Sequence, residues 1–318
     1  MALVTPQEVA AAATRIAPYI RRTPPVRVPG RSLWVKPESR QPTGSFKVRG
    51  AVNAIARLAA SGTTRVVAHS SGNHGQAVAY AAARFGLEAT IVVPETAPRL
   101  KVDAIRRRGA DVVVVPPAER EASALELGAA RQAPLVHSDD PDVIAGHGTL
   151  GLEIARDLER VGLVLVPVCN GGLLAGIAAA IKARDPRVRV VGVEPELAGD
   201  AAESFRRRML VPWPTERTYR TVADGLRAPV LGAHAWEHVT RYVDGIVTVS
   251  EDGIRDAMRA LRDEAGLVAE PSGAVATAAF LTRRDALPDC PTVAVLSGGN
   301  VEARAFAALV ATPYRLAA

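Results

Sequence analysis

The sequence predicts an α/β fold with two domains, in which mostly parallel sheets lie between layers of helices in a three-layer arrangement. Short apolar runs rich in β-branched residues recur along the chain, with helical patterns between most of them. Strands that are apolar on both faces are typical of parallel sheets covered by helices on both sides. A length of 318 residues is also sufficient for two cores. The predicted strands are RVVAH (65–69), ATIVVP (89–94), DVVVVP (111–116), LVLVPV (163–168), RVVGVE (189–194), GIVTVS (245–250) and TVAVLS (292–297).

The spacing of these strands predicts how the domains divide the chain. The strands between 65 and 116 form one compact βαβ cluster, and the later strands form another. We therefore expect residues 53–142 to form a small domain, and residues 1–52 together with 143–318 to form a large domain. The N-terminal stretch MALVTPQEVAAAATRI is expected to contain a short amphipathic helix.

Composition narrows the function classes. The net charge is +6 and the pI is near 9.7, but acidic residues are interleaved with the arginines, so we expect no nucleic-acid partner. No apolar run approaches the roughly 20 residues of a membrane helix, and the N-terminus does not resemble a secretory signal. The only cysteines, Cys169 and Cys290, lack the spacing of a disulfide framework or a zinc site. These features predict a cytoplasmic protein whose basic surface suits an anionic small molecule.

One lysine lies in an unusual place. The chain has only four lysines, and Lys47 follows a Thr-Gly-Ser turn at the start of a predicted helix. Positive charge is unfavourable at a helix N-terminus. A lysine that loses its proton can act as an amine nucleophile, whereas arginine cannot. Lys47 is therefore a candidate for amine chemistry.

Glycine-rich segments follow two predicted strands, at the strand ends where α/β folds bind ligands. In SSGNHGQ, Ser70 or Ser71 is placed to cap the next helix, and Gly72 and Gly75 each cost roughly 1 kcal/mol relative to alanine. We infer that either the turn or a closely approaching ligand requires these glycines. The segment CNGGLLAG predicts a phosphate cradle at a helix N-terminus.

The second glycine turn leaves other interpretations of the protein open. A strand, a glycine turn, a helix and a strand that ends in Glu194 are also typical of a dinucleotide-binding unit. The glycines lack the G-x-G-x-x-G spacing, so an NAD-dependent oxidoreductase is the weaker alternative. A non-catalytic basic binding protein is the other.

Two further strand ends carry polar residues. Ser297 is placed either to contact a ligand or to cap the next helix, and considered alone it favours the cap. Glu194 and Asp200 lie close together after a strand, which suits either a hard cation with oxygen ligands or a solvated acidic loop.

Taken together, these segments resemble the fold-type II pyridoxal-phosphate enzymes, which share the tryptophan synthase β-like fold. The similar segments are TGSFKVRGA around Lys47, SSGNHGQA around Asn73, the glycine turn after LVPV, EPSGA at 270–274 and SGGN at 297–300. The branch that the chain resembles most is that of the serine/threonine dehydratases and serine racemases, and the resemblance covers nearly the whole chain. It implies pyridoxal 5'-phosphate between the two domains, a small amino-acid substrate and a homodimer.

The resemblance implies a role for each matching residue. Lys47 is expected to form the internal aldimine, and Ser71 to carry a proton on the opposite face of the cofactor. The expected cofactor contacts are Phe46, Asn73 at the phenolic oxygen, Cys169, Asn170, Gly171, Gly172 and Leu173 at the phosphate, and Ser297 at the pyridine nitrogen. The expected substrate contacts are Ser70, Ser71, Gly72, Asn73, His74 and Arg120. Glu194, the carbonyl of Ala198 and Asp200 match the ligands of a structural Mg²⁺ or Ca²⁺.

The phosphate turn departs from the family pattern, which has four glycines where this chain has Cys169-Asn170-Gly171-Gly172. Asn170 tolerates left-handed backbone angles, so the cradle is expected to survive. Cys169 is a less obvious fit.

The residue expected at the pyridine nitrogen favours one type of reaction. A serine such as Ser297 cannot keep that nitrogen protonated, which suits reactions in which a β-leaving group departs promptly. The resemblance thus implies a dehydratase that converts L-threonine or L-serine to a 2-oxo acid and ammonia, by β-elimination through an external aldimine and an aminoacrylate. Serine racemase and 3-hydroxyaspartate dehydratase activities stay open as alternatives.

Overall fold

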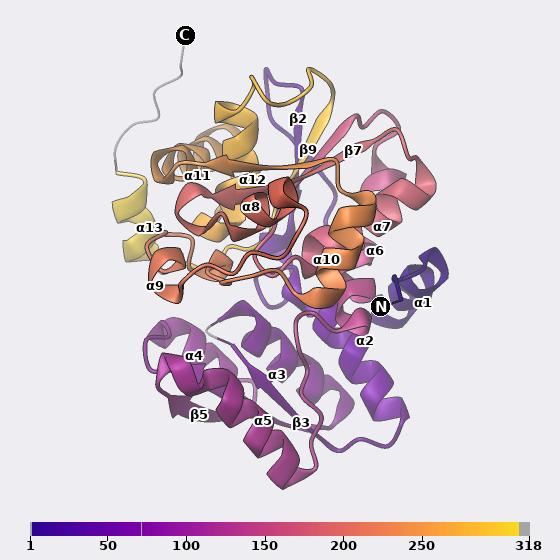
Figure 1. Cartoon of the computed structure of the whole chain (residues 1–318), viewed down its shortest axis with the longest axis vertical. Helices are drawn as coiled ribbons and strands as arrows, with labels where there is room; N and C mark the ends of the chain where they lie inside the picture. Colours follow the sequence, from indigo (N-terminus) through magenta and orange to yellow (C-terminus); the bar gives the residue numbers. More distant parts are fainter. Residues whose placement is uncertain (1, 71, 312–318) are drawn as a thin grey trace.

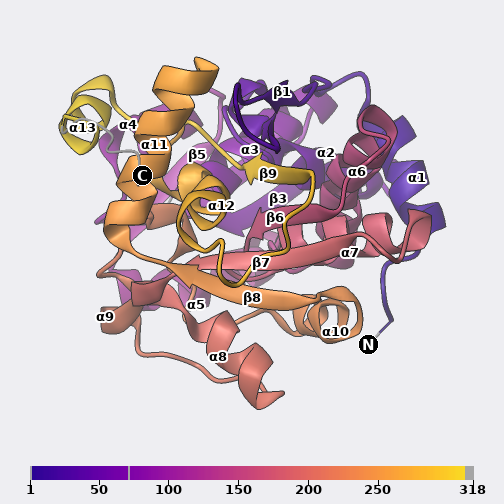
Figure 2. The same ribbon diagram turned by 90° about the horizontal axis from the view of Figure 1, so that it is seen from above.

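The structure, a computed structural model, describes residues 2–70 and 72–311. Within these residues the chain forms a six-stranded and a three-stranded sheet, each with its own helices. In Figure 1 the smaller sheet and its helices, in purple and magenta, lie below the larger part of the molecule. Figure 2 gives the view from above, in which the strands of the larger sheet fan out between helices.

The larger sheet has the strand order β1-β2-β9-β6-β7-β8, and all its neighbouring pairs are parallel except β1 and β2. The smaller sheet has the order β3-β4-β5 and is parallel throughout. The strands are β1 (Val26–Arg27), β2 (Leu33–Pro37), β3 (Arg65–His69), β4 (Glu88–Pro94), β5 (Asp111–Val115), β6 (Leu163–Pro167), β7 (Arg189–Pro195), β8 (Gly245–Val249) and β9 (Thr292–Leu296).

Helices connect and cover these strands. They are α1 (Pro6–Ile16), α2 (Lys47–Ala60), α3 (Asn73–Phe85), α4 (Arg99–Arg106), α5 (Arg120–Arg131), α6 (Pro141–Asp157), α7 (Gly172–Arg184), α8 (Asp200–Arg207), α9 (Thr215–Thr218), α10 (Ala233–Tyr242), α11 (Glu251–Ala265), α12 (Pro271–Thr282) and α13 (Ala303–Leu309). Successive side chains of β6 point to opposite faces of the larger sheet, so they show which helices cover each face. Leu163 and Leu165 pack against α11 and α12. Val164 and Val166 pack against α6, α7 and α10. The small sheet packs α2, α3 and α4 on one face and α5 on the other.

The structure confirms the α/β class and every predicted strand, with ends that agree within one residue. β1 and β2 were not predicted from the sequence. β1 is only two residues long, and in β2, with the sequence LWVKP, the buried Lys36 conceals the apolar pattern. The expected domain boundaries stay predictions, and they fall inside α2 and in the first turn of α6. Across residues 2–70 and 72–311, none of the helices combines the length and the apolar character required to cross a membrane.

Candidate active site

Two distant segments meet at the carboxyl end of β9, and together they fix the start of α2. The N–H of Phe46 donates to the carbonyl of Ser297 at 2.9 Å, and Ser45 pairs with Gly298 in an isolated antiparallel bridge. Lys47 is the first residue of α2, as predicted. The candidate lysine is therefore held beside the candidate serine.

The Lys47 amine lies in a setting that favours loss of its proton. Nζ lies 4.9 Å from the centroid of the Phe46 ring, and it makes no hydrogen bond or ion pair with any residue in the described ranges. Burial lowers the pKa of this amine, and only the Cys169 thiol acts in the opposite direction. A largely buried lysine without a carboxylate partner is an available nucleophile.

Asn73 begins α3 and joins the small sheet to the large one. Its Nδ2 donates to Glu270 Oε1 at 2.5 Å, and its Oδ1 accepts from Asn300 Nδ2 at 2.8 Å. Lys101 of α4 approaches the same carboxylate, with Nζ at 3.3 Å from Glu270 Oε2 and at 2.5 Å from Asp224 Oδ2. The amide of Asn73 is thus oriented by groups from both parts of the molecule.

The turn between β6 and α7 has the backbone of an anion cradle. Cys169 has φ +57° and Gly171 has φ +89°, and the first N–H groups of α7 have no acceptor within the helix. A Cβ on Gly171 would lie 2.7 Å from Leu231 Cδ2 and 2.8 Å from Ala235 Cβ, so a glycine is required there. Asn170 does not have a positive φ, so the turn forms without the left-handed angle that asparagine tolerates, and its place in the phosphate turn stays a prediction.

The reason lies in the contacts of Asn170. Its carbonyl accepts from the N–H of Gly232 at 3.0 Å, and its Nδ2 donates to Ser138 Oγ at 2.6 Å. Both bonds hold this residue in its present conformation, so the strained backbone angle falls on Cys169 instead.

Ser297 follows β9 and does not cap a helix. Its Oγ donates to the carbonyl of Ser272 at 3.3 Å, and the next helix, α13, has Glu302 at its N-cap. Ser297 is 5 % exposed. The cap interpretation of this hydroxyl is therefore wrong, and its contact with a ligand stays a prediction.

A sequence profile of the family described as "Pyridoxal-phosphate dependent enzyme" matches residues 16–298, most of the chain. The chain belongs to this family. Among curated relatives, L-threonine ammonia-lyase of Thermotoga maritima is 43% identical over 281 residues, which are 86% of this chain and 69% of that protein. Human serine racemase is 41% identical over 285 residues, 86% of this chain and 82% of that protein. A solved structure of the T.th. threonine deaminase superposes with a TM-score of 0.87 at 42% identity, covering 94% of this chain and 99% of that one.

The site of this pyridoxal-phosphate family enzyme fits the cofactor. The turn before α7 presents N–H groups at a helix N-terminus, where a phosphate is stabilised. A Cβ on Gly298 would lie 3.2 Å from Ser45 Cβ and 3.3 Å from Asn73 Nδ2, so the backbone passes closely here. His147 is fully buried, and both its ring nitrogens lack partners in the described part of the chain. Unpartnered buried polar atoms of this kind are typical of sites that hold a further group.

The substrate loop predicted for this enzyme follows β3. The Ser70 hydroxyl accepts from the N–H of Gly72 at 3.0 Å, and Gly72 itself is the N-cap of α3, so the prediction that Ser70 caps the helix is wrong. Ser71 lies outside the described residues. Burial, followed by the charge of Lys47, lowers the pKa of His74 to about 3, and its Nε2 lies 2.9 Å from the carbonyl of Val136.

Arg120 begins α5, and its charge reaches the same loop. Its Nε is buried without a hydrogen-bond partner among the described residues. Burial and then the Arg120 charge lower the pKa of His69, which immediately precedes Ser70, to about 4. Arg120 thus acts on the residue that precedes the loop, and its role as a substrate contact stays a prediction.

Glu194, near the end of β7, lies close to Ala198 and Asp200, which follow the strand, and all three residues are 1 % exposed or less. Glu194 Oε2 accepts from the N–H of Ala202 at 2.9 Å, whereas Asp200 Oδ2 has no partner in the described part of the chain. Burial raises the pKa of both carboxyls, and the charge of Asp200 adds to the effect at Glu194. Two adjacent buried carboxylates, neither paired with a basic side chain among the residues described, suit a cation with oxygen ligands.

The sequence analysis missed three residues at the site. Glu270 and Asn300 lie within the motifs that it quoted, but their bonds to Asn73 join segments 197 and 227 residues apart. Lys101 gave one usable signal, since it is one of the few lysines in a chain rich in arginine.

Proposed function

We propose that this family member is an ammonia-lyase that converts L-threonine or L-serine to a 2-oxo acid and ammonia. The observation that carries the proposal is the Lys47 amine, which has a lowered pKa and no partner among the described residues, and which is held beside Ser297. Pyridoxal phosphate, when bound, supplies the electron-withdrawing ring that makes the α-proton of an amino acid acidic.

Lys47 is the base in this proposal. Burial favours its neutral form, and a neutral amine at the start of α2 is free of the unfavourable charge at a helix N-terminus. The Phe46 ring covers one side of the amine at 4.9 Å and shields it from water. The amine can therefore take the α-proton of the substrate and return it to the leaving hydroxyl group.

Asn73, Ser297 and the turn before α7 orient the cofactor. Glu270 and Asn300 fix the Asn73 amide, which leaves the second N–H of its Nδ2 available for the phenolic oxygen. The turn from Cys169 to Leu173 holds the phosphate through backbone N–H groups other than that of Gly171, which donates to the carbonyl of Val168 at 3.1 Å. Ser297 offers a neutral hydroxyl to the ring nitrogen, and this favours prompt departure of a β-hydroxyl over a long-lived carbanion.

Ser70, Gly72 and His74 bind the substrate carboxylate at the N-terminus of α3, with Arg120 as the cationic contact. A helix N-terminus favours an anion at this position. Serine racemisation and 3-hydroxyaspartate dehydration are the alternatives. Racemisation is supported by the serine racemases among the similar proteins and requires Ser71 as an acid on the opposite face.

Glu194, the carbonyl of Ala198 and Asp200 are proposed to hold a structural Mg²⁺ or Ca²⁺. The buried, unpartnered Asp200 oxygen supports this assignment. The family resemblance supports a homodimer, which light scattering tests. Cys169 and Cys290 are both free, which fits a reducing cytoplasm.

The purified protein tests the assignment directly. We expect visible absorption that borohydride abolishes, and we expect Lys47→Ala to lack it. Lys182→Ala is the matched control. Lys182 lies near the C-terminal end of α7 and pairs with Asp244, so we expect its replacement to leave the absorption unchanged.

The substrate is identified by assaying L-threonine, L-serine, D-serine and both 3-hydroxyaspartates for 2-oxo acid and for inversion. We expect 2-oxo acid from L-threonine and L-serine. A protein that only inverts serine contradicts the ammonia-lyase assignment, and a colourless protein contradicts the mechanism as a whole.

A further inference from the structure

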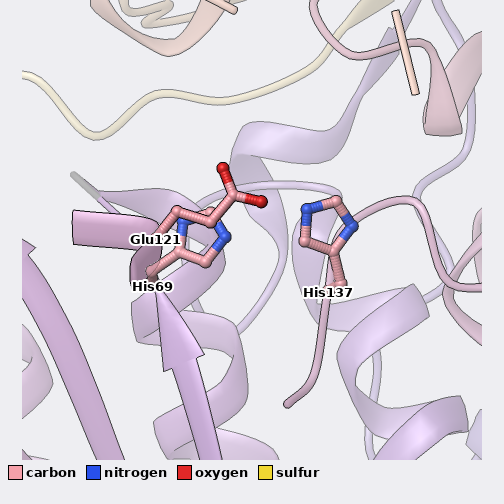
Figure 3. Close-up of side chains that lie close together, drawn as sticks. All are labelled: His69, Glu121 and His137. Carbon is pink, nitrogen blue, oxygen red and sulfur yellow. The ribbon is translucent and has the colours of Figure 1, made fainter. Parts of the chain in front are cut away.

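A separate group of metal-ligating side chains lies beside the small sheet. His69, Glu121 and His137 each offer one ligand atom, and these atoms lie within 4.8 Å of one another. They come from the end of β3, from the first turn of α5 and from the segment before α6. Figure 3 shows the two imidazole rings and the carboxylate turned toward a common space. The proposed lyase reaction uses none of the three.

The two histidine rings are tilted toward each other and do not stack face to face. Their ring centroids are 5.5 Å apart with an interplanar angle of 46°. His69 Nε2 is buried and has no hydrogen-bond partner among residues 2–70 and 72–311. A buried imidazole nitrogen that carries no hydrogen bond is a ready lone-pair donor, and imidazole is the commonest metal ligand.

We propose that His69, Glu121 and His137 bind a late first-row transition-metal cation such as Zn²⁺, through two imidazole nitrogens and one carboxylate oxygen. Two histidines and one glutamate with an open fourth position are an established zinc ligand set. Nitrogen donors select Zn²⁺, Cu²⁺ or Ni²⁺ over Mg²⁺ and Ca²⁺.

The three ligand atoms need to move only a short distance toward one another to bind an ion. Ligand atoms about 2.1 Å from a tetrahedral ion lie about 3.4 Å from one another. The limit of 4.8 Å between the present atoms exceeds that separation by about 1.4 Å. Glu121 is exposed and can supply most of this movement by rotation of its side chain.

Two contacts limit the affinity and the choice of ion. The N–H of Asp139 donates to His137 Nδ1 at 3.1 Å, so metal binding at the other nitrogen must move the ring proton and give up this bond. The Arg120 charge, which acts on His69, repels a cation. The ion must therefore be held by coordinate bonds to nitrogen, and a hard cation held mainly by charge is disfavoured.

A bound ion would connect three segments of the small sheet region. It would fix the end of β3, one residue before Ser70, to α5 and to the segment that leads into α6. We therefore expect Zn²⁺ to raise the melting temperature of the protein, since a ligand that binds only the folded state stabilises it.

The test uses the holoprotein, stripped of transition metals and kept in excess Mg²⁺ so that hard oxygen sites are filled. Zn²⁺ is titrated in competition with a chromophoric chelator, and Co²⁺ is added as a spectroscopic probe of the ligand field. We expect one ion per chain, and an affinity at least about tenfold lower for Glu121→Gln and for His137→Ala. Matched controls are Glu126→Gln, an exposed carboxylate on the same helix, and His234→Ala, a partly buried histidine outside the cluster.

Equal affinity of Glu121→Gln and the parent protein overturns the site, and so does loss of Zn²⁺ binding in Cys169→Ser or Asp200→Asn. Glu121 is exposed, so its variant is informative even if the histidine variants do not fold. The measurement involves no turnover, and its outcome is independent of the proposed lyase activity.

Discussion

Lys36 is fully buried and Lys47 is partly buried, and the two lysines have different neighbours. Lys36 Nζ lies 2.6 Å from Glu153 Oε2 and 3.8 Å from Asp157 Oδ2, whereas Lys47 has no ion pair in the described part of the chain. Burial lowers the pKa of both amines, and only at Lys36 do carboxylates oppose it. Lys36 is thus held by carboxylates in a structural role, whereas Lys47 is left free to react.

The paired region extends from Lys36 to the helix that carries Lys47. Arg49 is fully buried, and its Nε and Nη2 donate to Glu38 at 2.7 and 2.8 Å, while Nη1 donates to Glu153 at 2.8 Å. The pKa of Arg49 is raised because the Glu38 and Glu153 contacts outweigh burial, which acts to lower it. This network anchors α2 at Arg49, two residues after Lys47. The ion pairs of Lys36 and Arg49 therefore support the position of the Lys47 amine.

The largest expected effect comes from replacing the unpaired amine. Lys47→Arg keeps a long basic side chain but removes the nucleophile, because arginine does not lose its proton at any working pH. We expect formation of 2-oxo acid from L-threonine to fall by about a thousandfold or more while the protein stays folded. Lys182→Arg is the matched control, and retention of a tenth of the activity by Lys47→Arg would end the distinction drawn between the two lysines.

Breaking the paired network tests the other half of the comparison. Arg49→Met leaves the Glu38 carboxylate buried and uncompensated, and we expect a loss of about 3–5 kcal/mol in the free energy of unfolding in urea. Arg57→Met on the same helix is the control, because its pair with Asp142 has side chains 54% and 39% exposed. That variant is expected to lose about 0–1 kcal/mol. Similar losses in the two variants would contradict the structural role of the network.

The turn before α7 gives a further test, because Gly171 in it is expected to help hold the cofactor near Lys47. Gly171→Ala meets both a positive φ and the side chains of Leu231 and Ala235, and we expect it to cost about 2–3 kcal/mol and to weaken cofactor binding. Gly62→Ala is the control, since Gly62 has φ +84° but nothing within 4 Å of an added Cβ. Urea unfolding and spectrophotometric cofactor titration measure the two effects. Unchanged cofactor affinity in Gly171→Ala would show that the turn does not hold the phosphate.

Glu194 and Asp200 are the acidic counterpart of Lys47, and they give the smallest expected effect. Burial raises the pKa of Asp200 from 3.8 to about 7, so the folded state binds protons that the unfolded state has lost. In the presence of a chelator, stability should therefore fall as pH rises from about 5 to about 7, by about 2 kcal/mol. Mg²⁺ or Ca²⁺ should restore it at the upper pH, and Asp200→Asn should show a flatter profile. A cation effect that is equal in Asp200→Asn would place the ion elsewhere.

The parts of the molecule that the sequence predicted correctly depend on contiguous residues. A buried parallel strand such as β6 is apolar on both faces, so its identity does not depend on which strands it pairs with. The start of α2 at Lys47 and the turn before α7 are likewise local features. These features needed no knowledge of distant partners.

The parts that were missed depend on tertiary contacts. Lys36 gives β2 a polar pattern, and only the Glu153 carboxylate of a distant helix explains how it is buried. The left-handed angle lies on Cys169 and not on Asn170, because bonds from Gly232 and to Ser138 fix the asparagine. Local propensity predicts the opposite order for these two residues.

The hydrogen bonds around the candidate lysine have a consequence for how the chain matures. Asn300 Nδ2 bonds the carbonyl of Thr43 across 257 residues, and Asn73 meets Glu270 across 197. The lysine-bearing segment therefore leaves the ribosome long before the residues that complete its surroundings. We expect vitamin B6 capture to wait until Glu270 and Asn300 have been synthesised, so that a shorter nascent chain does not carry an incomplete, reactive centre.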